Sequence, residues 1–217
     1  MEEVIVFGAG PHAKVVVDVL EHMGRYRVVG LLDDERGLHG TARWGCTVLG
    51  GREQLAGLRA RGVARFIVAL GDNRQRQAVF EEIAKTGFVP VAAVHPSTQR
   101  GGRVTIGAGT LVVAGAVVNV DSVIGEDVII NTGATVDHDC RIGAHAHLSP
   151  GVHLAGGVAV GELSHIGIGA VVLPYLSIGR ASTVGAGAVV RENVPDGVMV
   201  AGNPARPIRG DEESRGF

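Results

Sequence analysis

The hydrophobic pattern divides the chain into two parts with different periods. In the first part, short apolar runs alternate with stretches in which apolar residues recur at helical spacing. The pattern predicts strands at 4–7, 28–32, 66–70 and 89–94, with helices at about 11–23 and 74–86. Strands that alternate with helices are typical of a parallel sheet covered on both faces. We therefore expect a small Rossmann-like parallel α/β domain over residues 1–97.

Beyond this domain the apolar period becomes six. Every sixth residue from Ile106 to Val190 is aliphatic, fifteen in a row without an insertion. The residue four positions after each of them is never charged or aromatic. Glycine follows the aliphatic residue at every eighteenth position, at 107, 125, 143, 161 and 179. Six residues with one inward aliphatic describe one flat side of a β-solenoid, so three sides make a triangular coil. The pattern predicts a parallel β-helix of five coils within residues 98–217.

Composition agrees with this division and excludes several other classes. Glycine accounts for 34 of 217 residues, while aromatic residues make up only 4%. A bundle of long helices is disfavoured, because each interior glycine costs a helix roughly 1 kcal/mol relative to alanine. Collagen is excluded because glycine does not recur at every third residue. Disorder is excluded because 46% of the residues are hydrophobic and the net charge is only −2.

Charge and cysteine content limit the partners and the compartment. The 20 basic and 22 acidic residues give no basic field, so no nucleic-acid partner is expected. The apolar runs are far below the roughly 20 residues of a membrane-spanning helix, and the start lacks the regions of a signal peptide. Two cysteines cannot make a disulfide framework. We expect a soluble, cytoplasmic protein with no membrane partner.

Candidate ligand-binding groups lie where the predicted strands of the first part end. Gly8-x-Gly10-x-x-Ala13 follows the first strand, and Asp33 lies twenty residues beyond Ala13. Glycines at such a turn let backbone N–H groups approach a diphosphate. A carboxylate at that spacing accepts a hydrogen bond from a ribose hydroxyl. Fewer than 100 residues make at most half of a dinucleotide fold, so a smaller nucleotide fits better. A tight turn without a ligand is the alternative.

The motifs of both parts together resemble one enzyme family, the bacterial nucleotide-sugar acetyltransferases of the hexapeptide-repeat superfamily. This family includes the N-acetyltransferases of bacillosamine and perosamine precursors and the sialic-acid O-acetyltransferase branch. The matching segments are residues 4–12 (VIVFGAGPH), 32–34 (LDD), 69–73 (ALGDN), 94–97 (VHPS), 131–133 (NTG), 137–140 (DHDC) and 201–206 (AGNPAR). The resemblance implies a left-handed β-helix, acetyl-CoA as co-substrate, a nucleotide-sugar acceptor, no metal, and a homotrimer with active sites between subunits.

The resemblance assigns the catalytic base to His138 and its partner to Asp139, where many relatives have Glu. The repeat places His138 two residues after Val136, near a corner and facing outward. Asp139 is suited to orient the imidazole and raise its basicity. Gly156 lies eighteen residues on, directly above His138. We expect the missing side chain to leave room for the thioester and a backbone N–H to face the oxyanion.

The resemblance also assigns the acetyl-CoA contacts. The histidine that matches His147 contacts acetyl-CoA, and Ile168 and Ala186 line the CoA groove through their backbone. Arg206 and Arg209 are candidate partners of the CoA phosphates. His147 lies nine residues, or half a coil, from the predicted base. The two histidines are therefore expected to meet only across a subunit interface.

The nucleotide-sugar site is expected at the edge of the α/β domain. The backbone of Gly10, Pro11 and His12 would cradle the diphosphate. Asp33 and Asp34 would bind the nucleoside. Gly71, which follows the third predicted strand, would let the ligand approach the backbone closely.

The function implied is acetyl transfer from acetyl-CoA to the 4-amino group of a UDP- or GDP-linked sugar, directly and without an acetyl-enzyme at Cys140. Sugar or sialic-acid O-acetylation is the alternative. Relatives have an aromatic residue where this chain has His165, eighteen residues after His147. This departure raises the alternative of a zinc enzyme of carbonic-anhydrase type, in which His147, His153 and His165 from two subunits of a trimer bind the metal. A further alternative is a non-catalytic nucleotide-binding module fused to a structural solenoid.

Overall fold

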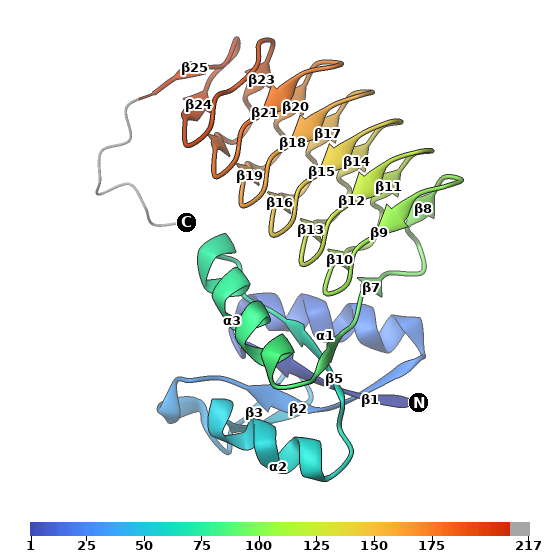
Figure 1. The fold of residues 1–217 in the computed structure, drawn as a ribbon, viewed down its shortest axis with the longest axis vertical. Helices are drawn as coiled ribbons and strands as arrows, with labels where there is room; N and C mark the ends of the chain where they lie inside the picture. The colour runs from blue at the N-terminus through green and yellow to red at the C-terminus, as the bar shows by residue number, and fades with distance from the viewer. Residues whose placement is uncertain (209–217) are drawn as a thin grey trace. The chain divides into compact units, whose positions relative to one another are not determined.

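The computed structural model describes residues 1–208 and divides into two compact units, Met1–Pro96 and Ser97–Phe217 (Figure 1). The first unit contains one mixed α/β sheet, and the second contains a solenoid of short parallel strands. None of the helices within residues 1–208 is both long and apolar enough to cross a membrane.

The sheet of the first unit has six strands in the order β3-β4-β2-β1-β5-β6. All neighbours are parallel except β3 and β4. The strands are β1 (Glu2–Phe7), β2 (Tyr26–Leu32), β3 (Ala42–Arg43), β4 (Cys46–Gly50), β5 (Arg65–Val68) and β6 (Val89–Pro90), and a short β7 (Ala93–Val94) follows. The continuous strand expected at 89–94 is therefore wrong, since two residues outside regular structure separate β6 from β7.

Three helices accompany the sheet: α1 (Pro11–Met23), α2 (Leu55–Ala60) and α3 (Asn73–Lys85), with single 3₁₀ turns η1 (Arg36–Leu38) and η2 (Arg52–Gln54). Pro11 occupies the first turn of α1, where its missing N–H costs nothing, and Gly24 ends the helix in a left-handed conformation. Asp72 caps α3 by accepting a hydrogen bond from the amide of Gln75. These signals fix both ends of α1 and the start of α3.

The second unit has three faces of stacked two-residue strands, named here by their first strand. The β8 face contains β8 (Gln99–Arg100), β11 (Val117–Val118), β14 (Thr135–Val136), β17 (His153–Leu154), β20 (Val171–Val172) and β23 (Val189–Val190). The β9 face contains β9 (Thr105–Ile106), β12 (Val123–Ile124), β15 (Arg141–Ile142), β18 (Ala159–Val160) and β21 (Ser177–Ile178). The β10 face contains β10 (Leu111–Val112), β13 (Ile129–Ile130), β16 (His147–Leu148), β19 (His165–Ile166), β22 (Thr183–Val184), the three-residue β24 (Met199–Ala201) and an antiparallel β25 (Arg206–Pro207).

The six-residue repeat forms the core of this solenoid. From Val112 to Val190, the fourteen repeated aliphatic side chains are at most 3% exposed, and Ile106 in the first coil is half-buried. Paired strands are in register at a separation of eighteen residues, as in Thr135 with His153. The predicted 18-residue coil is therefore the unit of the structure.

Each corner of the solenoid turns through one left-handed residue. Every sixth residue from Arg103 to Gly187 has a φ between 51° and 76°. A left-handed conformation costs an L-residue roughly 1–2 kcal/mol, yet eight of these fifteen positions hold a residue other than glycine. They include Asp139, His145 and Tyr175. The sequence repeat therefore does not reveal these corners by glycine alone.

The glycines that recur every eighteen residues are required for a different reason than the left-handed corners. A β-carbon added at Gly107, Gly125, Gly143, Gly161 or Gly179 would lie 2.4–2.7 Å from backbone of the next part of the chain. For Gly143 the nearest atom is the backbone nitrogen of Glu162, at 2.5 Å. Successive coils approach too closely at this column for any side chain.

This difference between the two kinds of glycine is testable. We expect Gly143→Ala to lower the free energy of unfolding by about 2–3 kcal/mol, because a methyl group would push two coils apart. Gly133→Ala is the matched control, since its site has open space and only a left-handed φ of 65°. It should cost about 1 kcal/mol. Urea unfolding of both variants measures the two values, and a Gly143 variant as stable as the Gly133 variant would contradict the account.

Candidate active site

His138 and Asp139 form a hydrogen-bonded pair at the corner between β14 and β15. The Nδ1–H of His138 donates to Oδ2 of Asp139 at 2.8 Å, and the His138 side chain is 46% exposed. The backbone N–H of His138 also donates to Oδ1 of Asp137 at 2.9 Å. Because Nδ1 is occupied by the carboxylate, Nε2 is the nitrogen available to accept a proton.

The pair also sets the charge state of the imidazole. The hydrogen bond that His138 donates to Asp139 raises the pKa of His138 above its ordinary value, and the charges of Asp137 and Asp139 act in the same direction. Partial desolvation opposes them. A raised pKa makes the neutral imidazole a stronger base, which suits the role predicted for His138.

Gly156 lies against the imidazole of His138. A β-carbon at Gly156 would be 2.6 Å from both Cε1 and Nε2 of that ring. The missing side chain at Gly156 therefore makes room for the imidazole of His138. That it also leaves room for the thioester stays a prediction. The N–H of Gly156 has no hydrogen-bond acceptor among residues 1–208, whereas the next amide, that of Gly157, donates to the carbonyl of His138. One backbone donor next to the imidazole is thus left for a ligand.

His147 lies on the β10 face, half a coil from His138 along the chain. Its ring stacks on that of His165, with centroids 4.8 Å apart and an angle of 26° between the planes. The side chain of Asn131 lies 3.4 Å from Nε2 of His147, and the hydroxyl of Ser149 hydrogen-bonds Nε2 of His165 at 2.9 Å. His153 belongs to the β8 face and hydrogen-bonds Thr135. These three histidines therefore do not meet within one chain, and a zinc site shared between two subunits stays a prediction.

Within residues 1–208, one group of three side chains has the donors and spacing to hold a metal ion. It consists of Asp18 and His22 on α1 and His95 after β7, all in the first unit. None of the residues predicted for catalysis belongs to it.

Two of the predicted CoA contacts lie at one exposed corner between the β10 and β8 faces. Ile168 and Ala186 are both exposed and lie one coil apart, and the carbonyl of Ile168 accepts a hydrogen bond from Gly187. Arg206 is exposed and pairs with Glu192 at 3.4 Å. Arg209 lies outside the described residues.

Gly8, Gly10 and Gly71, at the strand ends of the first unit, are glycine for two different reasons. Gly8 has a φ of 113°, and a β-carbon there would be 2.7 Å from the carbonyl oxygen of Ala69, so the fold itself requires it. Gly10 and Gly71 have ordinary φ values and nothing within 4 Å of an added β-carbon. Nothing in the fold requires glycine at these two positions, which agrees with a ligand that approaches both.

Asp33 and Asp34 are already engaged within the first unit. Asp33 accepts hydrogen bonds from the backbone amides of Ala9, at 2.8 Å, and of Glu35, at 2.9 Å. Asp34 accepts from Nε of Arg52 at 2.8 Å. Asp33 therefore holds the glycine loop in place, a role that the spacing of the motif did not reveal.

His12 follows Pro11 in the first turn of α1 and is half-buried. Burial, with a smaller contribution from the charge of Arg76, lowers the pKa of His12 to about 4. His12 is thus neutral at physiological pH and brings no positive charge to this edge.

Two side chains at this edge were missed by the sequence reasoning. Arg76 of α3 is fully buried, and its guanidinium donates to the Asn73 side chain and to the carbonyl of Leu70, next to Gly71. Trp44 donates its indole N–H to the carbonyl of Ala9 at 3.2 Å. Arg76 and Trp44 each hold a loop in place, and neither belongs to a recognisable sequence motif. The only feature of the sequence that could have drawn attention to Trp44 is that it is the single tryptophan.

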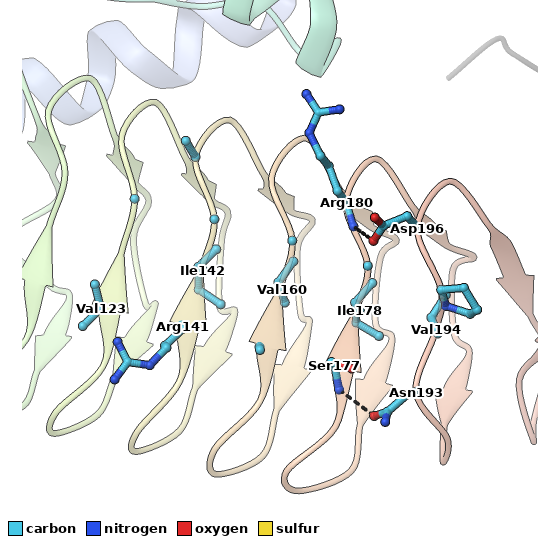
Figure 2. Close-up of a pocket in the computed structure, with 17 residues that line it drawn as sticks. Val123, Arg141, Ile142, Val160, Ser177, Ile178, Arg180, Asn193, Val194 and Asp196 are labelled. Atoms are coloured by element: carbon cyan, nitrogen blue, oxygen red, sulfur yellow. Dashed lines mark hydrogen bonds between the residues drawn. The ribbon is translucent and has the colours of Figure 1, made fainter.

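A groove of about 740 Å³ runs along the β9 face (Figure 2). Its floor includes Val123, Val160 and Ile178, and Arg141 and Arg180 lie along it. Asn193 accepts a hydrogen bond from the amide of Ser177 at one end. None of the predicted site residues lines this groove.

Comparisons with known proteins bear on the same residues. The model of the PglD N-terminal domain matches residues 3–83, and that of the bacterial transferase hexapeptide (six repeats) matches residues 121–156. A search of curated proteins found no match.

Several solved structures match almost the whole chain. PerB from Caulobacter crescentus, solved with CoA and GDP-perosamine, is 44% identical with a TM-score of 0.91, over 96% of this chain and 98% of that chain. The chain belongs to the bacterial nucleotide-sugar N-acetyltransferases. The acetyltransferase domain of PglB from Neisseria gonorrhoeae, solved with acetyl coenzyme A, is 39% identical with a TM-score of 0.88, over 95% and 99% of the two chains. WeeI from Acinetobacter baumannii is 27% identical with a TM-score of 0.83, over 96% and 100%.

Membership in this family confirms two predictions made from the motifs. The acetyltransferase is an enzyme of the hexapeptide-repeat superfamily, and its fold class is a Rossmann-like α/β domain followed by a left-handed β-helix. Two further structures of the Caulobacter enzyme each have one histidine replaced, by asparagine or by alanine. A histidine was therefore singled out for substitution in that relative.

The pairing of His138 with Asp139 is testable without an activity assay. We expect Asp139→Asn to lower the pKa of His138, because the hydrogen bond to a charged oxygen that raises this pKa is lost. An NMR titration of the imidazole C–H resonances follows this change. The resonances of the other histidines should titrate as they do in the wild-type protein. An unchanged or higher pKa of His138 in this variant would show that Asp139 does not tune the imidazole.

Proposed function

We propose that this acetyltransferase transfers an acetyl group from acetyl-CoA to the 4-amino group of a nucleotide-linked sugar. The observation that supports the proposal best is the His138–Asp139 pair packed against Gly156, which combines a base with a free N–H donor. In the relatives solved with ligands, CoA and GDP-perosamine occupy PerB, and acetyl-CoA occupies PglB. We infer that the second unit binds acetyl-CoA and the first unit binds the nucleotide sugar.

The reaction follows from the atoms of this corner. The neutral 4-amino nitrogen attacks the thioester carbonyl carbon, and the carbonyl oxygen becomes an oxyanion. Nε2 of His138 takes a proton from the attacking nitrogen, while Asp139 stabilises the imidazolium through Nδ1. The N–H of Gly156 donates to the oxyanion. Collapse of the intermediate breaks the carbon–sulfur bond, and the departing CoA thiolate receives the proton from His138.

Cys140 is poorly suited to form an acetyl-enzyme, which favours direct transfer. The residue is buried, and burial raises the pKa of its thiol above the ordinary value. Its Sγ lies 3.3 Å from the carbonyl oxygen of Ala155, to which the thiol donates. A protonated, buried thiol is a weak nucleophile.

The acceptor site is proposed at the glycine edge of the first unit. A diphosphate could lie close to the backbone at Gly10 and Gly71, where nothing is within 4 Å of an added β-carbon. It would accept hydrogen bonds from the amides at the start of α1. Pro11 and the neutral His12 border it, and Asp33 positions the loop. Asp34 is proposed to face the nucleoside despite its pairing with Arg52.

Two further proposals concern assembly and compartment. His138 and His147 lie half a coil apart, so a site that uses His138 as base and His147, Ile168 and Ala186 for acetyl-CoA needs a second subunit. This supports a homotrimer with active sites between subunits. We infer a cytoplasmic location, because both cysteines are free thiols, as is usual in a reducing compartment.

The test is release of CoA thiol from acetyl-CoA with GDP-, UDP- and CMP-linked 4-amino sugars. We expect turnover with at least one of them, and the GDP-linked sugar is tested first because PerB was solved with GDP-perosamine. The same nucleotide sugars with a 4-hydroxyl group are the matched control. Equal turnover of these analogues would favour O-acetylation, and no turnover with any acceptor would favour a non-catalytic binding module.

A further inference from the structure

An exposed apolar turn lies in the same corner column as His138. Residues 173–176, between β20 and β21, read Leu-Pro-Tyr-Leu. Tyr175 is 76% exposed and follows Asp139 by 36 residues, which is two coils. The turn therefore stands two coils along the axis from the catalytic pair, over the coil that contains Gly156 and Gly157.

The ring of Tyr175 reaches back to this intermediate coil. A β-carbon at Gly157 would lie 2.4 Å from Cδ1 and 2.7 Å from Cε1 of Tyr175. A β-carbon at Gly156 would meet the ring of His138. Two neighbouring glycines thus have two rings packed against them, one from the coil before and one from the coil after.

Backbone hydrogen bonds fix this arrangement. The amide of Gly157 donates to the carbonyl of His138 at 2.8 Å, and the amide of Tyr175 donates to the carbonyl of Gly156 at 2.9 Å. The two rings therefore reach the level of the same coil and lie over adjacent residues.

The fold itself does not explain an aromatic residue at this corner. Tyr175 has a φ of 59°, a conformation that costs a side chain roughly 1–2 kcal/mol and that glycine adopts one coil earlier. With most of its surface in solvent, the ring adds little to the core. Its hydroxyl has no hydrogen-bond partner within residues 1–208. A strained and exposed aromatic side chain next to a reacting group points to a ligand.

We propose that the ring of Tyr175 is the surface on which the acceptor sugar rests while its 4-amino group meets His138. This rests on the proposed function. A pyranose presents a C–H face that packs on an aromatic ring, and the phenol hydroxyl is free to bond a sugar hydroxyl. Tyr175 is thus a residue that binds and selects the acceptor, not one that moves a proton.

The test compares Tyr175→Gly with Tyr175→Phe in steady-state kinetics. Loss of the ring should raise the KM for the nucleotide-linked 4-amino sugar by about tenfold, while kcat and the KM for acetyl-CoA change by less than about threefold. Tyr175→Phe retains the ring and should stay within about threefold of the wild-type KM. Because glycine suits a left-handed corner, the melting temperature of Tyr175→Gly should not fall. Ala181→Gly, at the next left-handed corner, controls for the backbone change.

Three results would overturn this proposal: an unchanged acceptor KM in Tyr175→Gly, a rise in the KM for acetyl-CoA instead, or a smaller assembly by light scattering. The first shows that the ring touches no substrate, the second that it touches the donor, and the third that it is a subunit contact. Each of these leaves the proposed function intact if the wild-type enzyme turns over. Absence of wild-type turnover contradicts the proposed function itself.

Discussion

Neighbouring coils of the β-helix approach so closely that no side chain fits at one glycine column, where an added β-carbon would lie 2.4–2.7 Å from backbone of the next part of the chain. The paired strands from β8 to β23 keep a separation of eighteen residues, and every sixth residue from Arg103 to Gly187 is left-handed. Any residue is then placed directly against the residue eighteen positions later. His138 meets Gly156, and His147 meets His165. The outward side chains of the regular coils are stacked by this eighteen-residue register.

The same constraint gives the His138 corner its chemistry. The left-handed corner puts Asp139 within hydrogen-bond distance of Nδ1, which leaves Nε2 available and raises the basicity of the ring. The glycine in the following coil accommodates the imidazole and leaves one N–H donor without an acceptor in residues 1–208. A base and an oxyanion donor therefore lie together on a rigid solenoid, so neither group needs to move far during the reaction.

The sequence predicts the solenoid well because an aliphatic residue recurs at every sixth position from Ile106 to Val190 without an insertion. It does not predict β3, β4 or α2, since residues 42–60 show neither of the two periods over a long enough stretch. A motif names Asp33 and Asp34 but not their partners, the Ala9 amide and the Arg52 guanidinium, which lie 18 or more residues away. For another reason, the sequence pattern does not single out Tyr175. Corner residues vary freely as long as they tolerate a left-handed φ, so no repeat marks the one that faces a ligand.

The central claim is that the imidazole of His138 removes the proton during acetyl transfer, and the His138→Ala variant tests it most directly. We predict that kcat falls by at least about 100-fold, because a positioned base contributes roughly 10²–10⁴ to such a step. The dissociation constants for CoA and for the nucleotide sugar, measured by calorimetry, should stay within about threefold of wild type. A variant that turns over within about threefold of the wild-type rate would contradict the account.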